Sequence, residues 1–365
     1  MKILMINTVP MERNGITNVI CNIVQAINNP NVSVDCVSVN KPDKYYYDIF
    51  SSAKGQIYVI ENRLKCPILY FRKLVRLIKK NEYDCIHAHG NSHTLAIEML
   101  AARLAGCSVR IAHSHTTTCK YKVIDKIMKP IFDSSCTHNI ACGKEAGKWL
   151  FGRAEFEIFK NGIFTENYRF DENYRKLIRK KYCINENSIV IGHVGNFDDI
   201  KNQDWIIEIG KELSRQKIDF TIFLIGTGER LETIKKMVNE YNLEKNVIFT
   251  GVIDNVNQYL SAFDCVVMPS FFEGLPLTLI EEQAAGLKCF VSDSITKEVD
   301  ITGNVDFLSL NDNVENWAST IIKEQKKNNR DKDSDIAIKK IVKKGYDIAS
   351  ESEKLLDFYI KICNR

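Results

Sequence analysis

The sequence predicts an α/β protein made of two doubly wound domains, each built on a parallel sheet. Short apolar runs alternate with longer amphipathic segments along most of the chain, which is typical of buried parallel strands joined by helices. Two such series follow one another. A length of 365 residues is about that of two ordinary domains, and a hydrophobic fraction of 45% is enough for two cores.

The first series lies in the N-terminal half. Its expected strands are 2–7, 33–39, 56–60, 85–89, 109–113 and 138–141. Apolar residues recur at helical spacing between these runs, and the helices expected from them are 17–28, 67–81 and 92–104.

The second series repeats the pattern further along. Its expected strands are 189–194, 220–225, 247–250, 265–269 and 288–292, and its expected helices are 205–216, 230–241 and 279–285. The stretch 165–173 is polar and has no period, so it reads as a linker. The predicted domains are therefore residues 1–165 and 166–345.

The composition indicates which classes of binding partner are not expected and in which cellular compartment the protein is expected. The formal net charge of +4 is mild, and no clustered basic module indicates nucleic-acid binding. No run approaches the roughly 18 apolar residues of a membrane span. The start of the chain does not resemble a signal peptide, and the twelve cysteines form no Cys-x-x-Cys pair. These features predict a cytoplasmic protein with reduced, mostly buried cysteines.

The most informative segment is 265–286, where an apolar strand leads through a glycine-containing loop into a helix. Such a loop offers backbone N–H groups and the positive end of a helix dipole to an anion such as a diphosphate. Glu273 lies in the loop and Glu281 in the helix, and carboxylates accept hydrogen bonds from vicinal hydroxyls. The alternative is a solvent-facing helix start whose glutamate complements the dipole.

This segment resembles the glutamate-x7-glutamate motif of the fourth family of retaining glycosyltransferases, which have the GT-B fold of two Rossmann-like domains facing a cleft. The resemblance covers nearly the whole chain and is strongest over 189–292. It implies that Glu281 binds the ribose of a nucleotide-sugar donor, and that Glu282 lies outside the site. The residues expected to hold the donor sugar and phosphates are Glu273, Gly274, Leu275, Pro276, Leu277 and Thr278.

A second polar loop follows the strand at 189–194. Lys201 resembles the family lysine that neutralises the donor diphosphate, and an ammonium suits charge developing on a leaving phosphate. Asn196 stands where the family usually has an arginine, which puts the usual two-cation clamp in doubt or implies another cation. An ordinary loop lysine is the alternative for Lys201.

Three further donor contacts are implied by the resemblance. Gly226 lies in a Gly-x-Gly turn at a strand end, and Val252 is placed to contact the nucleobase through its main chain. Gly15 resembles the glycine loop that lies between acceptor and donor phosphate, although this chain has one glycine where many relatives have two. A plain strand-to-helix turn is the alternative for Gly15.

Two His-x-His pairs end strands in the N-terminal half, at residues 87 and 89 and at residues 113 and 115. Paired imidazoles suggest a zinc hydrolase, but no Asp or Glu lies at ligand spacing. The resemblance instead places one histidine of the second pair beside the donor sugar, as a hydrogen-bonding group that is not a nucleophile. His115 is preferred over His113, and a buried core histidine is the alternative for either.

The segment 67–81 predicts a basic amphipathic helix that starts at a proline. One interpretation is docking to an anionic membrane that carries a lipid-linked acceptor, with the protein peripheral on the inner face of the cell membrane. The other is a crossover helix with its basic face in water.

The resemblance as a whole implies a retaining glycosyltransferase, similar to those that build bacterial capsular polysaccharides and exopolysaccharides. The resemblance implies a UDP-linked hexose or N-acetylhexosamine as donor, a saccharide or lipid-linked oligosaccharide as acceptor, and neither metal nor cofactor. It also implies that residues 346–365 pack back on the N-terminal domain. The alternatives are a UDP-sugar epimerase on the same fold and a non-catalytic sugar-nucleotide-binding homologue.

Overall fold

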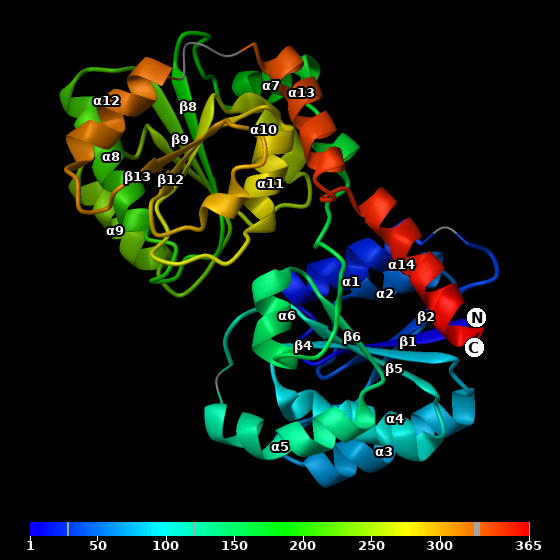
Figure 1. Ribbon diagram of the computed structural model, residues 1–365. Coiled ribbons are helices and arrows are strands. Elements are labelled where there is room, and N and C mark those ends of the chain that lie inside the picture. Colours follow the sequence, from blue (N-terminus) through cyan, green and yellow to red (C-terminus); the bar gives the residue numbers. More distant parts are fainter. Residues whose placement is uncertain (28, 120, 325–328, 365) are drawn as a thin grey trace. The chain divides into compact units, whose positions relative to one another are not determined.

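The computed structural model describes residues 1–27, 29–119, 121–324 and 329–364. They form two compact units, of which the first combines Met1–Gly162 with Gly345–Arg365 and the second is Ile163–Lys344 (Figure 1). Residue 28, the last of one predicted helix, lies outside the described residues, as does the final residue of the predicted C-terminal segment. No helix among these described ranges is long and apolar enough to cross a membrane.

The first unit contains a seven-stranded parallel sheet in the order β3-β2-β1-β4-β5-β6-β7. Its strands are β1 (Lys2–Asn7), β2 (Ser33–Ser38), β3 (Ile57–Val59), β4 (Cys85–Gly90), β5 (Val109–Ser114), β6 (His138–Ala141) and β7 (Glu157–Ile158). Its helices are α1 (Gly15–Ala26), α2 (Lys44–Ser52), α3 (Pro67–Asn81), α4 (Ala96–Ala105), α5 (Lys122–Ser135), α6 (Lys144–Phe151) and α14 (Ile348–Cys363). In Figure 1, α1, α2 and α14 cover one face of this sheet, and α3, α4 and α5 cover the other.

The second unit contains a six-stranded parallel sheet in the order β10-β9-β8-β11-β12-β13. Its strands are β8 (Ile189–Val194), β9 (Phe220–Ile225), β10 (Val247–Gly251), β11 (Cys265–Met268), β12 (Lys288–Ser292) and β13 (Val305–Leu308). Its helices are α7 (Glu172–Lys181), α8 (Gln203–Arg215), α9 (Leu231–Glu240), α10 (Val256–Ala262), α11 (Leu277–Ala284), α12 (Val314–Glu324) and α13 (Arg330–Lys343).

Both sheets are buried on their two faces, which is why their strands read as continuous apolar runs. Every residue of β4 and β9 is buried. The amphipathic helices then cover the faces: α3 starts at Pro67 and buries Tyr70, Leu74 and Ile78, one turn apart, on the sheet. The predicted doubly wound α/β class is confirmed for both units.

The strand orders fix where a ligand can bind. In each sheet the chain order reverses between two neighbouring strands, at β1 and β4 in the first unit and at β8 and β11 in the second. In open α/β sheets, ligands bind outside the carboxyl ends of the strands at such a switch point.

One local prediction, the linker, is wrong, and several elements of the structure were not predicted. Where a polar linker is expected at 165–173, the chain forms a 3-10 helix, Thr165–Tyr168, and begins α7. The helix starts there because the Asp171 side chain accepts hydrogen bonds from the N–H groups of Asn173 and Tyr174. Strand β13 and the helices α2, α5, α6, α10 and α12 are not among the elements expected from the sequence. In α5, many apolar residues face outward rather than into a core.

Candidate functional site

At the switch point of the second sheet, the loops that follow β8 and β11 bring Lys201 and Glu273 into an ion pair. Nζ of Lys201 lies 2.6 Å from Oε1 of Glu273. The two side chains are 18% and 15% exposed, so the pair sits at the surface edge of the unit, where a ligand can reach it. A lysine in this place can exchange its carboxylate partner for the oxygens of a bound phosphate.

The Lys201 loop is held in shape by hydrogen bonds. Oδ1 of Asp198 accepts hydrogen bonds from the N–H groups of Ile200 and Lys201, each at 3.0 Å. Nδ2 of Asn202 donates to the carbonyl of Pro269 at 3.1 Å, and the N–H of Phe271 donates to the carbonyl of Ile200 at 2.8 Å. The two loops therefore form one hydrogen-bonded assembly, which fixes Lys201 before any ligand arrives.

The loop after β11 leads into α11 as the sequence predicts. Glu273 is followed by the exposed Gly274 and the half-buried Leu275, and Pro276 is the N-cap residue of α11, whose first turn holds Leu277 and Thr278. Proline at this position presets the extended backbone that enters the helix. The positive end of the α11 dipole thus lies directly after the Lys201–Glu273 pair.

Two neighbouring carboxyl groups on α11 have raised pKa values. Burial raises the pKa of Glu281 to about 7, while a hydrogen bond from Tyr168 lowers it. Burial, the charges of Glu281 and Glu273, and the opposing charge of Lys201 leave the pKa of Glu282 well above its usual value. Oε2 of Glu282 is buried and has no partner in the described part of the chain. Glu282, expected to lie outside the site, is thus electrostatically coupled to it.

The Gly-x-Gly turn after β9 packs against the β8 loop. Gly226 has φ +136°, and a Cβ there would lie 2.1 Å from the carbonyl oxygen of Gly195. Only glycine fits such a close backbone approach. The N–H of Gly226 also donates to the carbonyl of Gly251 at 3.0 Å. The next residue, Val252, is 48% exposed, and Asn196 is exposed in the β8 loop, so both can contact a ligand.

A cation that sequence reasoning missed lies near Asn196. The guanidinium of Arg230 pairs with Asp199 at 2.9 Å and with Asp204 at 2.8 Å, and its backbone N–H donates to the carbonyl of Phe197. Charged residues near a helix start are common, so its sequence position alone carried no signal. Arg230 is a candidate for the cation that Asn196 does not supply.

The first unit holds the other predicted residues. Gly15 is the exposed first residue of α1, whose N-cap Asn14 accepts a hydrogen bond from the N–H of Thr17. A Cβ on Gly15 would meet no described atom within 4 Å. Packing within this unit therefore does not demand a glycine at position 15.

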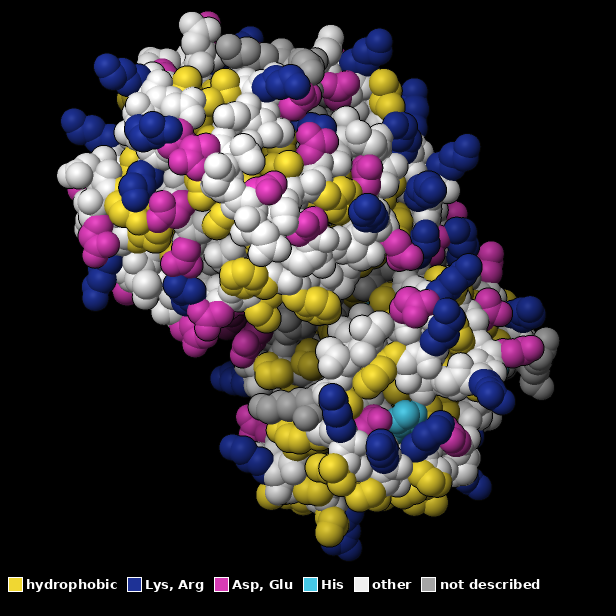
Figure 2. Space-filling model, turned by 60° about the vertical axis from the view of Figure 1, so that its left-hand side comes forward, with side chains coloured by type: hydrophobic (Ala, Val, Ile, Leu, Met, Phe, Trp, Pro, Cys, Tyr) yellow, Lys and Arg dark blue, Asp and Glu magenta, His cyan; other side chains and the backbone are white. Residues whose placement is uncertain are grey.

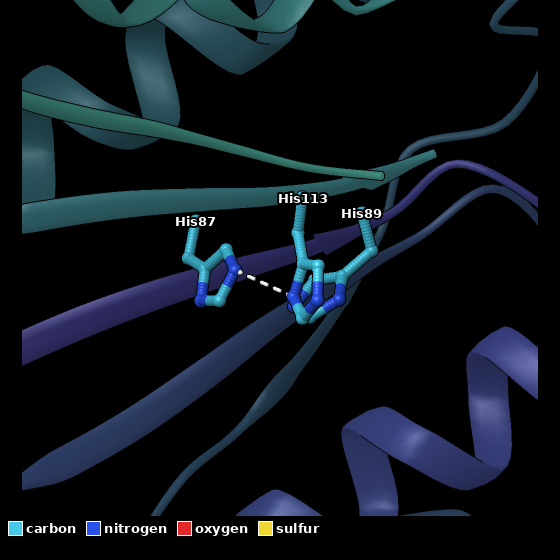
Figure 3. Close-up of side chains that lie close together, drawn as sticks. All are labelled: His87, His89 and His113. Atoms are coloured by element: carbon cyan, nitrogen blue, oxygen red, sulfur yellow. Dashed lines mark hydrogen bonds between the residues drawn. The ribbon is translucent and has the colours of Figure 1, made fainter. Parts of the chain in front are cut away.

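Four histidines gather at the carboxyl ends of β4 and β5, and three of them are drawn in Figure 3. Residues two apart in a strand share a face, so the rings of His87 and His89 stack. The register places His89 beside His113, whose ring is tilted against it. Nε2 of His87 lies 3.2 Å from Nδ1 of His113, and Nδ1 of His89 lies 3.0 Å from Nε2 of His115. Nδ1 of His87 lies 2.6 Å from the hydroxyl of Tyr359 in α14.

Burial keeps this histidine cluster (His87, His89, His113 and His115) neutral. It lowers the pKa of His87 to about 3 and that of His115 to about 4, and it holds the pKa values of His89 and His113 well below the usual range. His113 is only 1% exposed, whereas His115 is partly exposed. Of the two predicted donor contacts, His115 is the one a ligand can reach within this unit.

The structure thus brings Lys201, Glu273 and the first turn of α11 together in the second unit, with Glu281 further along the same helix. Gly15, His113 and His115 belong to the first unit. Two Rossmann-like units with polar groups at the strand ends define the GT-B class. HepE of Anabaena, solved in complex with UDP, has the same fold, with a TM-score of 0.79, 17% identity, and coverage of 99% of this chain and 100% of that one.

Sequence comparisons place the chain within that class. Residues 13–167 match the model of "Glycosyltransferase Family 4", and residues 174–340 match that of "Glycosyl transferases group 1". EpsF of Bacillus subtilis, named as a glycosyltransferase, is 33% identical over 325 residues, which cover 85% of this chain and 84% of EpsF. The UDP-Gal:alpha-D-GlcNAc-diphosphoundecaprenol alpha-1,3-galactosyltransferase of Escherichia coli is 28% identical over 307 residues, 79% of this chain and 78% of that protein. The chain belongs to this family of glycosyltransferases, so the predicted family and GT-B fold are confirmed.

Proposed function

We propose that this protein is a retaining glycosyltransferase that moves a hexose or an N-acetylhexosamine from a UDP-linked donor to a saccharide or lipid-linked acceptor in polysaccharide biosynthesis. The observation that carries the proposal is the Lys201–Glu273 pair at the switch point of the second sheet. The Escherichia coli relative is named for UDP-Gal and a diphosphoundecaprenol-linked sugar, and HepE was solved with UDP. Both names support a uridine carrier, and that of the Escherichia coli relative supports a lipid-linked acceptor.

The role proposed for Lys201 is to stabilise the negative charge of the leaving group. When the bond between the anomeric carbon and the diphosphate breaks, negative charge develops on the phosphate, and a cation held in position stabilises it. The hydrogen bonds that fix the Lys201 backbone mean that the side chain only has to turn from Glu273 to the phosphate. The start of α11 adds backbone N–H groups to the same anion. On this proposal, transfer proceeds without Mg²⁺ or Mn²⁺ at the diphosphate.

Two carboxyl groups are proposed to accept hydrogen bonds from hydroxyls of the donor. Glu281 binds the ribose, because a partly buried carboxylate forms strong hydrogen bonds to a pair of vicinal hydroxyls. Glu273, freed from Lys201 by the phosphate, accepts hydrogen bonds from the sugar. His115 contributes a further hydrogen bond to the sugar from the first unit, and Gly15 leaves room for the donor phosphates. Val252 contacts the base through its main chain.

Association with an anionic membrane is part of the proposal. Helix α3 exposes Ile68 and Leu69, and α5, packed on the same side of the sheet, exposes Val123, Ile124 and Ile127. The basic residues on these two helices are Arg72, Lys73, Arg76, Lys79, Lys80, Lys122, Lys126 and Lys129. Figure 2 shows hydrophobic and basic side chains intermingled at the lower end of this unit. Apolar side chains that enter the lipid boundary and lysines that contact anionic headgroups would hold the enzyme near a lipid-linked acceptor.

A binding experiment tests the donor site. UDP, GDP, ADP and their common sugars are titrated by calorimetry into wild type, Glu281→Gln and Lys201→Met, with Glu240→Gln and Lys236→Met as controls at exposed positions. We expect UDP to bind best and each site variant to weaken it about tenfold or more, roughly 1.4 kcal/mol. The control variants should bind UDP as wild type does. Equal binding by wild type and both site variants would overturn the placement of the site.

Product analysis tests the reaction itself. A transferase releases UDP and forms a new glycoside only when an acceptor is present, and retention gives a product with the anomeric configuration of the donor. Turnover of a UDP-sugar to another UDP-sugar without acceptor would instead indicate an epimerase. UDP binding with no turnover across an acceptor panel would indicate a non-catalytic homologue.

A further inference from the structure

The histidine cluster holds more ring nitrogens than hydrogen-bond partners. Nε2 of His89 and Nε2 of His113 are buried and have no hydrogen-bond partner among the residues that the structure describes. A buried polar atom left unpaired costs about 1–3 kcal/mol. Two such atoms in one cluster point to a ligand that binds imidazole nitrogen.

The geometry of the cluster suits a single ion. One ring nitrogen from each of His87, His89 and His113 lies within 4.8 Å of those of the other two. Figure 3 shows the three rings directed toward one another from two adjacent strands. In a tetrahedral zinc site with Zn–N bonds of about 2.0–2.1 Å, neighbouring nitrogens are roughly 3.3 Å apart. Nε2 of His87 and Nδ1 of His113 lie 3.2 Å apart, which is already that spacing, and a nitrogen of His89 lies within 4.8 Å of the set.

The type of ligand decides the type of ion. Three imidazoles suit Zn²⁺ and its first-row neighbours, whereas Mg²⁺ and Ca²⁺ require oxygen ligands. Sites with three histidines and an open fourth position are known for zinc. We propose that His87, His89 and His113 bind one divalent first-row transition-metal ion, with Zn²⁺ as its occupant.

Two of the three rings, those of His87 and His89, have the outer contacts that metal-bound histidines need. A histidine that binds a metal through one nitrogen donates its other N–H to a neighbouring group, which fixes the ring. Nδ1 of His87 has the Tyr359 hydroxyl at 2.6 Å, and Nδ1 of His89 has Nε2 of His115 at 3.0 Å. The ion would therefore connect β4 and β5 directly and α14 through Tyr359. This binding is separate from the leaving-group chemistry assigned to Lys201.

Metal titration of the wild-type chain is the first test. The full-length protein, freed of metal with a chelator and kept reduced, is titrated with Co²⁺ and Zn²⁺ after alkylation of the exposed thiols of Cys66 and Cys183. We expect one Co²⁺ per chain with visible bands of tetrahedral coordination by nitrogen, displaced by Zn²⁺, and a higher melting temperature with Zn²⁺. Absence of binding, or an intense thiolate-to-metal band that places the ion on cysteines, would overturn the proposal.

Variants locate the ion. His89→Gln should abolish Co²⁺ binding, and Tyr359→Phe, which keeps the buried ring and removes only the hydroxyl, should weaken Zn²⁺ binding by about 10–100-fold. His138→Gln, in β6 and outside the cluster, should bind Zn²⁺ as wild type does. If His89→Gln does not fold, the Co²⁺ spectrum of wild type and the Tyr359→Phe affinity decide. Wild-type affinity in Tyr359→Phe together with wild-type spectra in His89→Gln would contradict the assignment.

Discussion

Lys201 and Glu273 are 72 residues apart in the chain, yet their side chains form the shortest contact of the donor site. The sequence pattern could place each residue in a loop at a strand end, because strands and glycine-containing loops have local signatures. It could not pair them, because the pairing depends on β8 and β11 being neighbours in the sheet. The sequence also could not show which of the adjacent Glu281 and Glu282 is the more buried. Only the packing of α11 shows that Glu282 is almost fully buried.

The charge of Lys201 is expected to act on the rate rather than on stability. In Lys201→Met, kcat/KM for sugar transfer should fall by about 10²–10³-fold, as for other preorganised groups that stabilise a leaving charge. The ion pair with Glu273 is partly exposed, so the free energy of unfolding should change by less than about 1 kcal/mol. Initial rates and thermal melts, with Lys236→Met as control, measure both. A rate within threefold of wild type would remove Lys201 from the mechanism.

The raised pKa of Glu281 leads us to expect that the stability of the fold depends on pH. Burial raises its pKa from 4.5 to about 7 in the folded chain, so the folded state binds this proton more tightly than the unfolded state does. The stabilisation is therefore complete below about pH 4.5 and is lost as the pH rises to about 7. The melting temperature of wild type relative to Glu281→Gln should fall across this interval and then level off. A difference that does not vary with pH would contradict the raised pKa.

At the scale of elements, the predicted strands of the central sheets agree closely with the structure, and β1, β6, β8, β9 and β12 match residue for residue. Buried parallel strands can be recognised in the sequence because both of their faces are apolar. Helix α3 can be recognised in the same way, since it begins at a proline and its apolar residues recur at helical spacing. Helix α5 and the two-residue strand β7 were missed, because an outward-facing apolar helix and a short edge strand leave no such pattern.

The turn after β9 predicts a large effect of a small substitution. In Gly226→Ala the added Cβ would lie 2.1 Å from the Gly195 carbonyl oxygen, and the residue has a positive φ. We expect a loss of about 1–3 kcal/mol in the free energy of unfolding, with weaker UDP binding because the β8 loop shifts. Gly15→Ala is the matched control, because its Cβ meets open space. Denaturant unfolding compares the two, and equal stabilities would show that the turn adapts.

The exposed apolar face of α5 predicts lipid binding. Ile127 is 67% exposed, and burying one isoleucine side chain in lipid contributes about 1.5–3 kcal/mol. Ile127→Ser should therefore weaken co-sedimentation with vesicles that contain anionic lipid by about tenfold or more. Ile360→Ser, at another exposed isoleucine in α14, serves as control. Equal binding of the two variants, or equal binding of wild type to neutral vesicles, would exclude this surface.

For the whole molecule, the first unit is discontinuous in sequence, whereas the second is a single stretch. Helix α14 buries Ile348, Leu355, Tyr359 and Ile362 in the first unit. The pattern of the sequence shows an amphipathic helix there, but not which unit receives it, because apolar faces are not specific for a partner.

Deletion of residues 345–365 should therefore damage the unit that lies more than 180 residues earlier in the chain. Four buried side chains at about 1.5–3 kcal/mol each amount to a large part of the stability of an ordinary domain. Hydrogen exchange should show loss of protection in β1 and β4, while β8 and β9 keep theirs. Retained protection in β1 and β4 would show that α14 is dispensable.

The return of α14 to the first unit also sets an order of events during synthesis on the ribosome. The strands of the first unit emerge early, but α14, which packs on this sheet, is translated only after all of Ile163–Lys344. At about 5–20 residues per second, the nascent first unit waits for roughly ten seconds or more with part of one face uncovered, because α1 and α2 are present but α14 is not. The second unit, complete in one stretch, can fold during that interval, so the part of the chain that starts first is the part that finishes last.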